Sequence, residues 1–231
     1  MISIVNTECH VPKTFSDLAK IAAWGRLGHV RAADVGKDLI LLDLSDDSYL
    51  CLQGADGEDV ILALRGDDHD PGNPVIREVI DAGLLRAVDN HVPTILDPTW
   101  PVDGMPPRGN ALASLTLIPA VILGLVHYGL RRKALLRRPI RTAAKVRLDD
   151  AGVIRLVQRF RQLRILLPRS GRCFVQSWLL LRLLRKRGVA AEWIFGVRTY
   201  PFEAHCWVEW QGRVLNDWAD HVRWYDPIAR F

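Results

Sequence analysis

Three residues in the last third of the chain have the types and the order needed for nucleophilic catalysis. Cys173 opens a helical run, so its thiol would lie in the first turn, where the helix dipole favours a thiolate. His205 lies in the alternating stretch 203–210, which predicts a strand, and Asp217 ends the strand expected next. A cysteine on a helix, a histidine on a strand and an acid on the neighbouring strand match a nucleophile, a base and a residue that orients the base.

Each of these residues also has a structural interpretation. A small cysteine often packs at a buried helix start, and a carboxylate at position 217 is common at a strand end, with Asp220 as the alternative acid. Cys206 points to the opposite face of the strand from His205, and we expect it in the core. No metal site is predicted, because the cysteines form no CxxC pair and no cluster with histidine; they are Cys9, Cys51, Cys173 and Cys206.

The loop between the two strands decides the face on which Asp217 lies. With a two-residue loop, Gln211 and Gly212, the register puts Asp217 on the face away from His205. A three-residue loop or a bulge would put both side chains on one face. A catalytic role for Asp217 therefore predicts an odd-length loop or a bulge at this turn.

The helices that must position the site follow from hydrophobic periodicity. The fourteen residues after Cys173 are good helix formers and end at Gly188, a common helix stop. Residues 151–167 have apolar side chains at helical spacing and arginines on the other face, which predicts an amphipathic helix. The uncharged stretch 111–130 has the length of a membrane span but contains Pro119, so a buried core helix, which we favour, and a membrane-contacting segment both stay open.

The N-terminal part is expected to form a separate module. Residues 37–52 predict a β-hairpin, and Asn73 is placed to cap a helix over 74–84. Strands followed by short helices indicate a small winged-helix-like module over residues 1–88. The proline-rich segment 89–110 suits neither a helix nor a strand interior, and we expect a linker there, followed by a second domain over 111–231.

Charge and composition exclude several classes of function. Residues 1–130 carry 9 Lys/Arg and 18 Asp/Glu, whereas residues 131–200 carry 19 and 3. Zinc-finger spacing, a Walker loop and a Gly-rich aromatic strand motif are absent, so no nucleic-acid partner is predicted. The N-terminus lacks signal-peptide features, and we expect a cytoplasmic protein that could touch the membrane surface through 111–138.

The run from Cys173 to Asp217 resembles the transglutaminase-like cysteine peptidases of lasso-peptide biosynthesis, the B proteins. The matching features are the Cys with Ser177 on a Leu-rich helix, "GVRTYPFEAHCWV" and the closing Asn-Asp pair. A weaker resemblance over 28–86 is to a precursor-peptide recognition element. The resemblance implies an α+β chain: a winged-helix-like recognition module followed by a transglutaminase-like (papain-like) cysteine peptidase domain.

The resemblance implies an enzyme that removes the leader peptide from a ribosomally made lasso-peptide precursor before macrolactam cyclisation. Cys173 would be the nucleophile, His205 the base and then the acid, and Asp217 the residue that orients the imidazole. No cofactor is implied; ATP would serve only the asparagine-synthetase-like lasso cyclase that receives the freed core peptide. A transglutaminase-like acyltransferase and a non-catalytic precursor-binding scaffold are the alternatives.

In the recognition module, the leader would add as a strand to an exposed sheet edge near the predicted helix 74–84. The residues expected to contact the leader are Tyr49, Leu50, Cys51, Leu52, Ile76 and Ile80.

Overall fold

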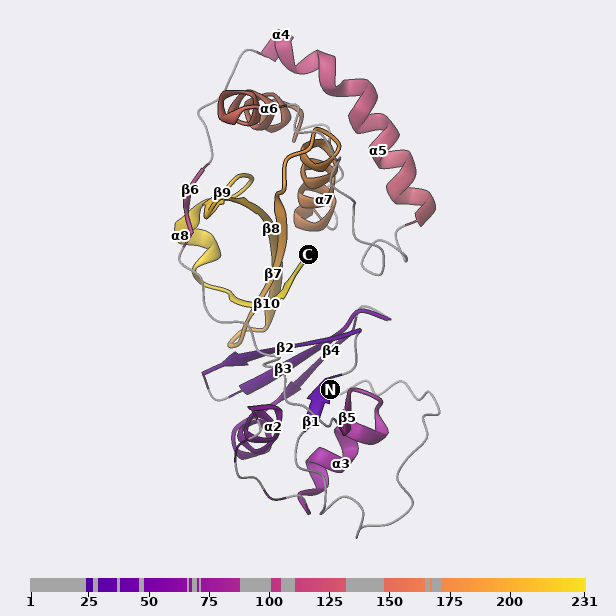
Figure 1. The fold of residues 1–231 in the computed structure, drawn as a ribbon, viewed down its shortest axis with the longest axis vertical. Coiled ribbons are helices and arrows are strands. Elements are labelled where there is room, and N and C mark those ends of the chain that lie inside the picture. Colours follow the sequence, from indigo (N-terminus) through magenta and orange to yellow (C-terminus); the bar gives the residue numbers. More distant parts are fainter. Residues whose placement is uncertain are drawn as a thin grey trace. The chain divides into compact units, whose positions relative to one another are not determined.

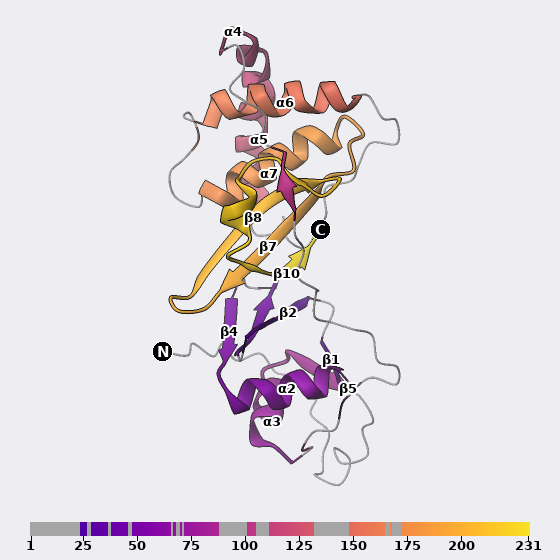
Figure 2. The same ribbon diagram turned by 90° about the vertical axis from the view of Figure 1, so that its left-hand side faces the viewer.

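The structure, a computed structural model, describes residues 24–26, 29–36, 38–45, 48–65, 67, 70, 72–87, 101–104, 111–131, 148–164, 167 and 172–231. The chain divides into two compact units (Figure 1, Figure 2). One comprises Met1–Asp97 with Thr199–Pro201, and the other Pro98–Arg198 with Phe202–Phe231. The division between Asp97 and Pro98 falls inside the segment predicted as a linker.

The first unit is built on a three-stranded antiparallel sheet in the order β2-β3-β4. The hairpin predicted over 37–52 is confirmed as β3 and β4, whereas β2 had no clear sequence signal. Helix α3 begins as predicted, because the Asn73 side chain accepts a hydrogen bond from Val75 N at 2.8 Å. The elements are β1 (Trp24–Arg26), β2 (Val30–Val35), β3 (Asp38–Asp43), β4 (Ser48–Leu52), α2 (Ala55–Arg65), α3 (Pro74–Asp81) and β5 (Leu85–Ala87).

The core of this unit lies between the sheet and its helices. Leu39 and Leu41 of β3 pack with Val60 and Leu64 of α2 and with Ile76 of α3. Apolar side chains at every second strand position and along one helix stripe therefore meet on one side of the sheet. The winged-helix assignment of this module stays a prediction.

The second unit contains a five-stranded mixed sheet in the order β10-β7-β8-β9-β6. Neighbouring strands are antiparallel except β6 and β9, which are parallel. The strands are β6 (Val102–Asp103), β7 (Glu192–Arg198), β8 (Glu203–Trp210), β9 (Arg213–Val214) and β10 (Asp226–Arg230).

Strand β6 lies inside the segment predicted to contain only linker, so that expectation is wrong at Val102–Asp103. Val102 N donates to Gly212 O, and Gly104 N donates to Val214 O, each at 2.9 Å. A two-residue strand at the edge of a sheet needs only a few backbone hydrogen bonds. The neighbouring prolines therefore do not prevent it.

Helices cover one side of this sheet in two layers, with α7 on β7 and β8 and with α5 and α6 on α7 (Figure 1, Figure 2). Helices α6 and α7 confirm the predictions from periodicity, and Gly188 after α7 has a φ of 77°, which suits a helix stop. The helices are α4 (Ala111–Ser114), the 3₁₀ turn η1 (Leu115–Leu117), α5 (Ile118–Arg131), α6 (Asp150–Leu163), α7 (Arg172–Arg185) and α8 (Ala219–Val222).

The expectation that 111–130 is a buried core helix is wrong. Among the described residues, Leu112–Leu130 is the one helical segment that is long and apolar enough to cross a membrane, by length and composition only. Only 22% of its apolar stretch is buried. One face, which includes Leu117 and Val121, packs inward, and the other is exposed. Uniform hydrophobicity gave no sign of this division, because both faces have apolar side chains.

Candidate active site

Cys173 is the second residue of α7, as the sequence predicted, and its side chain is half-buried. The helix packs on β8, the strand that carries His205. In this first helical turn the backbone N–H groups have no partner within the helix, so their positive ends favour a negative charge on sulfur. Helix α7 thus presents a thiol at the end where a thiolate is most easily formed.

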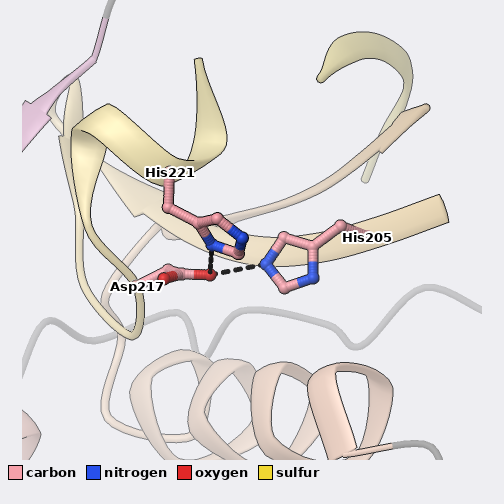
Figure 3. A group of neighbouring side chains, drawn as sticks. All are labelled: His205, Asp217 and His221. Atoms are coloured by element: carbon pink, nitrogen blue, oxygen red, sulfur yellow. Dashed lines mark hydrogen bonds and ion pairs between the residues drawn. The ribbon is translucent and has the colours of Figure 1, made fainter. Parts of the chain in front are cut away.

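His205 contacts both of the other residues singled out from the sequence. Its Nε2 lies 2.5 Å from Asp217 Oδ2 (Figure 3), and its ring also hydrogen-bonds to the Cys173 thiol. The structure therefore brings Cys173, His205 and Asp217 together at one site.

The imidazole of His205 is enclosed by aromatic rings. The ring centroids of Trp207 and Tyr225 lie 6.0 Å and 5.2 Å from that of His205. Opposite His205 on β7 is Gly196, where an added Cβ would lie 2.8 Å from atoms of Trp207 and Tyr225. A glycine at this position lets both rings close around the histidine.

Asp217 reaches His205 by a route that the sequence did not predict. The β8–β9 loop has two residues, with Trp210 paired to Arg213 and no shift of register at the turn. The prediction of an odd-length loop or a bulge there, made for a catalytic Asp217, is therefore wrong. Strand β9 ends at Val214, and the chain bends over the next three residues. Beyond Val214 the side chains no longer alternate between the two faces of a regular strand, so Asp217 can turn back toward β8.

The side chain of Asn216 holds this bend. Its Oδ1 accepts a hydrogen bond from Val208 N at 2.8 Å, in place of a backbone carbonyl of β9. Its Nδ2 donates to Ser177 Oγ at 2.9 Å, and the Ser177 hydroxyl donates to Cys206 O at 2.9 Å. Asn216 and Ser177 are both buried. The two residues link α7, β8 and the segment that carries Asp217.

The electrostatics of Cys173 and His205 favour a thiolate beside an imidazolium. A hydrogen bond from Cys206 and the hydrogen bond and charge of His205 outweigh burial and lower the pKa of Cys173 to about 4. Burial opposes a charge on His205, but its hydrogen bonds to Asp217 and Cys173 raise its pKa to about 9. Between these two values the sulfur is ionised without needing a base to remove its proton.

His221 is a fourth member of the site that the sequence analysis missed. Its Nδ1 lies 2.9 Å from the same Asp217 Oδ2 that binds His205 (Figure 3). Asp217 Oδ1 accepts from Trp218 N at 2.8 Å. Although burial raises the pKa of Asp217, these hydrogen bonds lower it to about 2, so the carboxylate stays charged. The only signal in the sequence was the i, i+4 spacing of Asp217 and His221.

Cys206 is buried, as expected, but it is also a partner of Cys173. Burial raises the pKa of Cys206 well above its usual value, as does the hydrogen bond to Cys173. Cys206 therefore stays a thiol and donates to the Cys173 thiolate. Asp220, the alternative acid, instead pairs with Arg223 at 2.9 Å on the surface.

His205, Asp217 and His221 are also the residues of the site that could hold a metal ion. Their ligand atoms lie within 4.8 Å of one another. In the observed arrangement, however, each imidazole donates a proton to the carboxylate oxygen, and the raised pKa of His205 favours its protonated form. A metal would need both of these nitrogens deprotonated.

The residues predicted to contact a leader peptide lie together in the first unit, with different exposure. Strand β4 is an edge strand of the described sheet, and its positions 49–52 are half-buried. Leu50, Leu52 and Ile80 pack against the core of the unit. Ile76 is 1% exposed and belongs to that core, so a peptide could not contact it directly.

Residues 116–230 match the family model of the transglutaminase-like superfamily, and the α+β chain therefore contains a transglutaminase-like domain. A curated protein, the microcin J25-processing protein McjB of Escherichia coli, is 47% identical over 45 residues. The aligned part covers 20% of this chain and 22% of McjB, about a fifth of the length of each. No solved structure matches the chain. The two matches support a relationship to the B proteins of lasso-peptide biosynthesis.

Proposed function

We propose that the protein is a cysteine peptidase that removes the leader peptide from a lasso-peptide precursor before macrolactam cyclisation. The proximity of Cys173, His205 and Asp217 carries this proposal. The transglutaminase-like domain and the similarity to McjB agree with it. The order of a thiolate, an imidazolium and a carboxylate suits cleavage of an acyl bond.

In the proposed reaction, the Cys173 thiolate attacks the carbonyl carbon that joins leader and core. The backbone N–H of Cys173 is the expected donor to the oxyanion. His205 donates its proton to the departing amine, and the core peptide leaves. His205 then takes a proton from water, which hydrolyses the thioester and frees the leader. Asp217 remains ionised throughout and stabilises the charged imidazole.

The first unit supplies leader binding in this proposal. Strand β4 has one neighbour in the described sheet, β3, so a peptide strand could add along its other edge. Tyr49, Leu50, Cys51 and Leu52 would contact the leader, and Ile80 would border the groove, while Ile76 supports it from the core. The other proposed partner is an asparagine-synthetase-like cyclase, which would use ATP to close the ring; the peptidase itself would need no cofactor. We place both steps in the cytoplasm.

Two alternatives predict different products. An acyltransferase would use the same three residues but would transfer the leader acyl group from the Cys173 thioester to an amine. The leader would then remain attached to that amine. A non-catalytic scaffold needs an unreactive, packed thiol at position 173. The half-buried Cys173 and its hydrogen bond to His205 favour catalysis over the scaffold.

The test is mass spectrometry of a precursor peptide after incubation with the full chain, with Cys173→Ala and with Cys173→Ser. Peptidase activity predicts free leader and free core from the wild type, and an intact but bound precursor from both variants. An isopeptide product would instead establish the acyltransferase. Unchanged precursor in all three samples, with equal binding, would establish the scaffold. Thermal unfolding of each variant shows whether it is folded.

A further inference from the structure

The exposed side of the Leu112–Leu130 segment is an apolar face. Its large side chains are between 53% and 80% exposed. Steps of one, three, four or seven residues separate them along the chain, which places them in one stripe along the helix. We call this stripe the apolar helix face; it consists of Leu112, Leu115, Ile122, Leu123, Val126 and Leu130.

The opposite side of the segment is fixed on α7. The rings of His127 and Tyr128 lie 5.7 Å and 6.1 Å from that of Trp178. Gly124 packs so closely on Leu179 that a Cβ there would require this leucine to move. Because these contacts fix the rotation of the helix, the apolar helix face points away from α7. Among the described helices on this side of the sheet, α5 lies farther out than α7 (Figure 1).

Two features argue against a transmembrane helix and against a protein partner. Protein contacts occupy one side of the segment, so lipid could not surround it. Protein interfaces combine an apolar centre with hydrogen-bonding groups and a polar rim. Residues 111–130 contain no Asp, Glu, Lys or Arg, and all six side chains of the apolar helix face are aliphatic. This composition suits the acyl region just below lipid headgroups.

The charge of the rest of the domain indicates the type of lipid. Residues 111–231 carry 22 Lys/Arg and 8 Asp/Glu, a net charge of +14. Eight of the basic residues lie in the seventeen positions directly after the apolar segment, 131–147, which contain no acidic residue. Basic residues next to an apolar helix face are attracted to anionic headgroups.

We propose that the apolar helix face docks the protein on an anionic membrane surface, with the helix lying in the plane of the headgroups. The apolar side chains enter the upper acyl region while α7 and the sheet remain in water. This docking is independent of the proposed peptidase activity.

The test is co-sedimentation of the full chain with vesicles of phosphatidylcholine alone or mixed with phosphatidylglycerol. The wild type is expected to bind the mixed vesicles at least about tenfold more tightly than vesicles of phosphatidylcholine alone. Its affinity for the mixed vesicles should fall as salt is added. The double variant Ile122→Glu/Val126→Glu should lose about tenfold or more of this affinity, because two charges replace inserted apolar groups. Both positions are more than half exposed, so the fold should tolerate the change.

The matched control is Ile154→Glu on α6, which places the same charge at an apolar position that is 39% exposed but lies outside the apolar helix face. It should bind vesicles like the wild type. Failure of the wild type to bind mixed vesicles, or equal binding by the double variant, would overturn the proposal. So would a wild-type dimer that the double variant converts to a monomer, because the face would then be an interface between copies of the chain. Circular dichroism of all variants verifies folding.

Discussion

Asn216 Nδ2 donates a hydrogen bond to Ser177 Oγ over 2.9 Å, between two buried side chains. Ser177 lies one helical turn after Cys173, and Asn216 directly precedes Asp217. Through Cys206 O, which accepts from Ser177, the same hydrogen bonds reach the residue next to His205. One buried polar link therefore joins the three backbone segments that carry the proposed nucleophile, base and orienting acid.

Removal of this link should lower the rate of the reaction more than substrate binding. Asn216→Ala leaves Val208 N without its acceptor and Ser177 Oγ without its donor. Two lost buried hydrogen bonds should reduce the free energy of unfolding by about 2–4 kcal/mol. Steady-state kinetics on a precursor peptide should show a lower kcat with little change in KM, because leader binding is assigned to the first unit.

Asn216→Asp is the matched variant for that experiment. It keeps an acceptor for Val208 N but loses the donor to Ser177, so its kcat should lie between those of the wild type and Asn216→Ala. A wild-type kcat in both variants would show that this link does not position the site.

The Asp217 carboxylate should matter far more than the nearby Asp220. Asp217→Asn removes the charge that stabilises the His205 imidazolium, and kcat/KM should fall by about 10³-fold or more. Asp220→Asn removes an exposed acid paired with Arg223 and should leave kcat/KM unchanged. Equal losses in the two variants would contradict the assignment of the acid.

His221 should contribute by holding the Asp217 carboxylate in place. His221→Ala removes one of the two imidazoles bound to Asp217 Oδ2 but leaves the contacts from His205 and Trp218 N. The expected loss in kcat is at most about 150-fold, since a hydrogen bond to a charged group contributes about 1.5–3 kcal/mol and each 1.4 kcal/mol is about tenfold in rate. A loss as large as that of Asp217→Asn would place His221 among the reacting groups instead.

The thiol of Cys173 should react in acid, where ordinary thiols do not. With pKa values of about 4 for Cys173 and about 9 for His205, the thiolate persists as the pH falls, until Cys173 is protonated near pH 4. The rate of alkylation by iodoacetamide, followed by intact mass, should therefore stay high at pH 6. His205→Ala should lower that rate at least about tenfold, because the pKa of the thiol rises.

Cys206→Ala tests the second support of the thiolate. Loss of the hydrogen bond from Cys206 should raise the pKa of Cys173 and shift the acid limb of the alkylation profile to higher pH. His205 is unchanged in this variant, so the pKa of Cys173 should still lie below that of an ordinary thiol. Identical limbs in Cys206→Ala and the wild type would show that Cys206 only packs.

The packing around His205 can be tested at Gly196. Gly196→Ala puts a methyl group against Trp207 and Tyr225, and overpacking of this kind costs about 1–3 kcal/mol. The variant should unfold at a lower temperature. Gly129→Ala on α5 is the control: a Cβ there meets nothing within 4 Å, and alanine favours the helix, so the unfolding temperature should stay level or rise.

Local chemistry made several parts of the structure predictable. The hairpin of β3 and β4, the Asn73 cap, helices α6 and α7 and strand β8 follow from periodicity and capping, which short stretches of sequence specify. The proximity of Cys173, His205 and Asp217 was predicted from their order on a helix and two strands. The structure brings these residues together, and their catalytic roles stay a proposal.

Features that depend on contacts across the fold were not predictable from local patterns. The bend that carries Asp217 depends on a hydrogen bond from Asn216 to Ser177, thirty-nine positions earlier. The exposure of Leu112–Leu130 depends on which face meets α7, and an all-apolar segment does not specify that face. Strand β6 forms because β9 offers a parallel partner, although the prolines around it argued against a strand.

The most direct test of the central claim is rapid chemical quench of the full chain with a precursor peptide, followed by intact-protein mass spectrometry. Cleavage through a Cys173 thioester predicts a transient species that carries the leader as an acyl group, mapped to Cys173 by peptide digestion at acidic pH. The species should precede free leader in time and be missing from Cys173→Ala. Release of leader by Cys173→Ala at the wild-type rate, or an acyl group on another residue, would contradict the account.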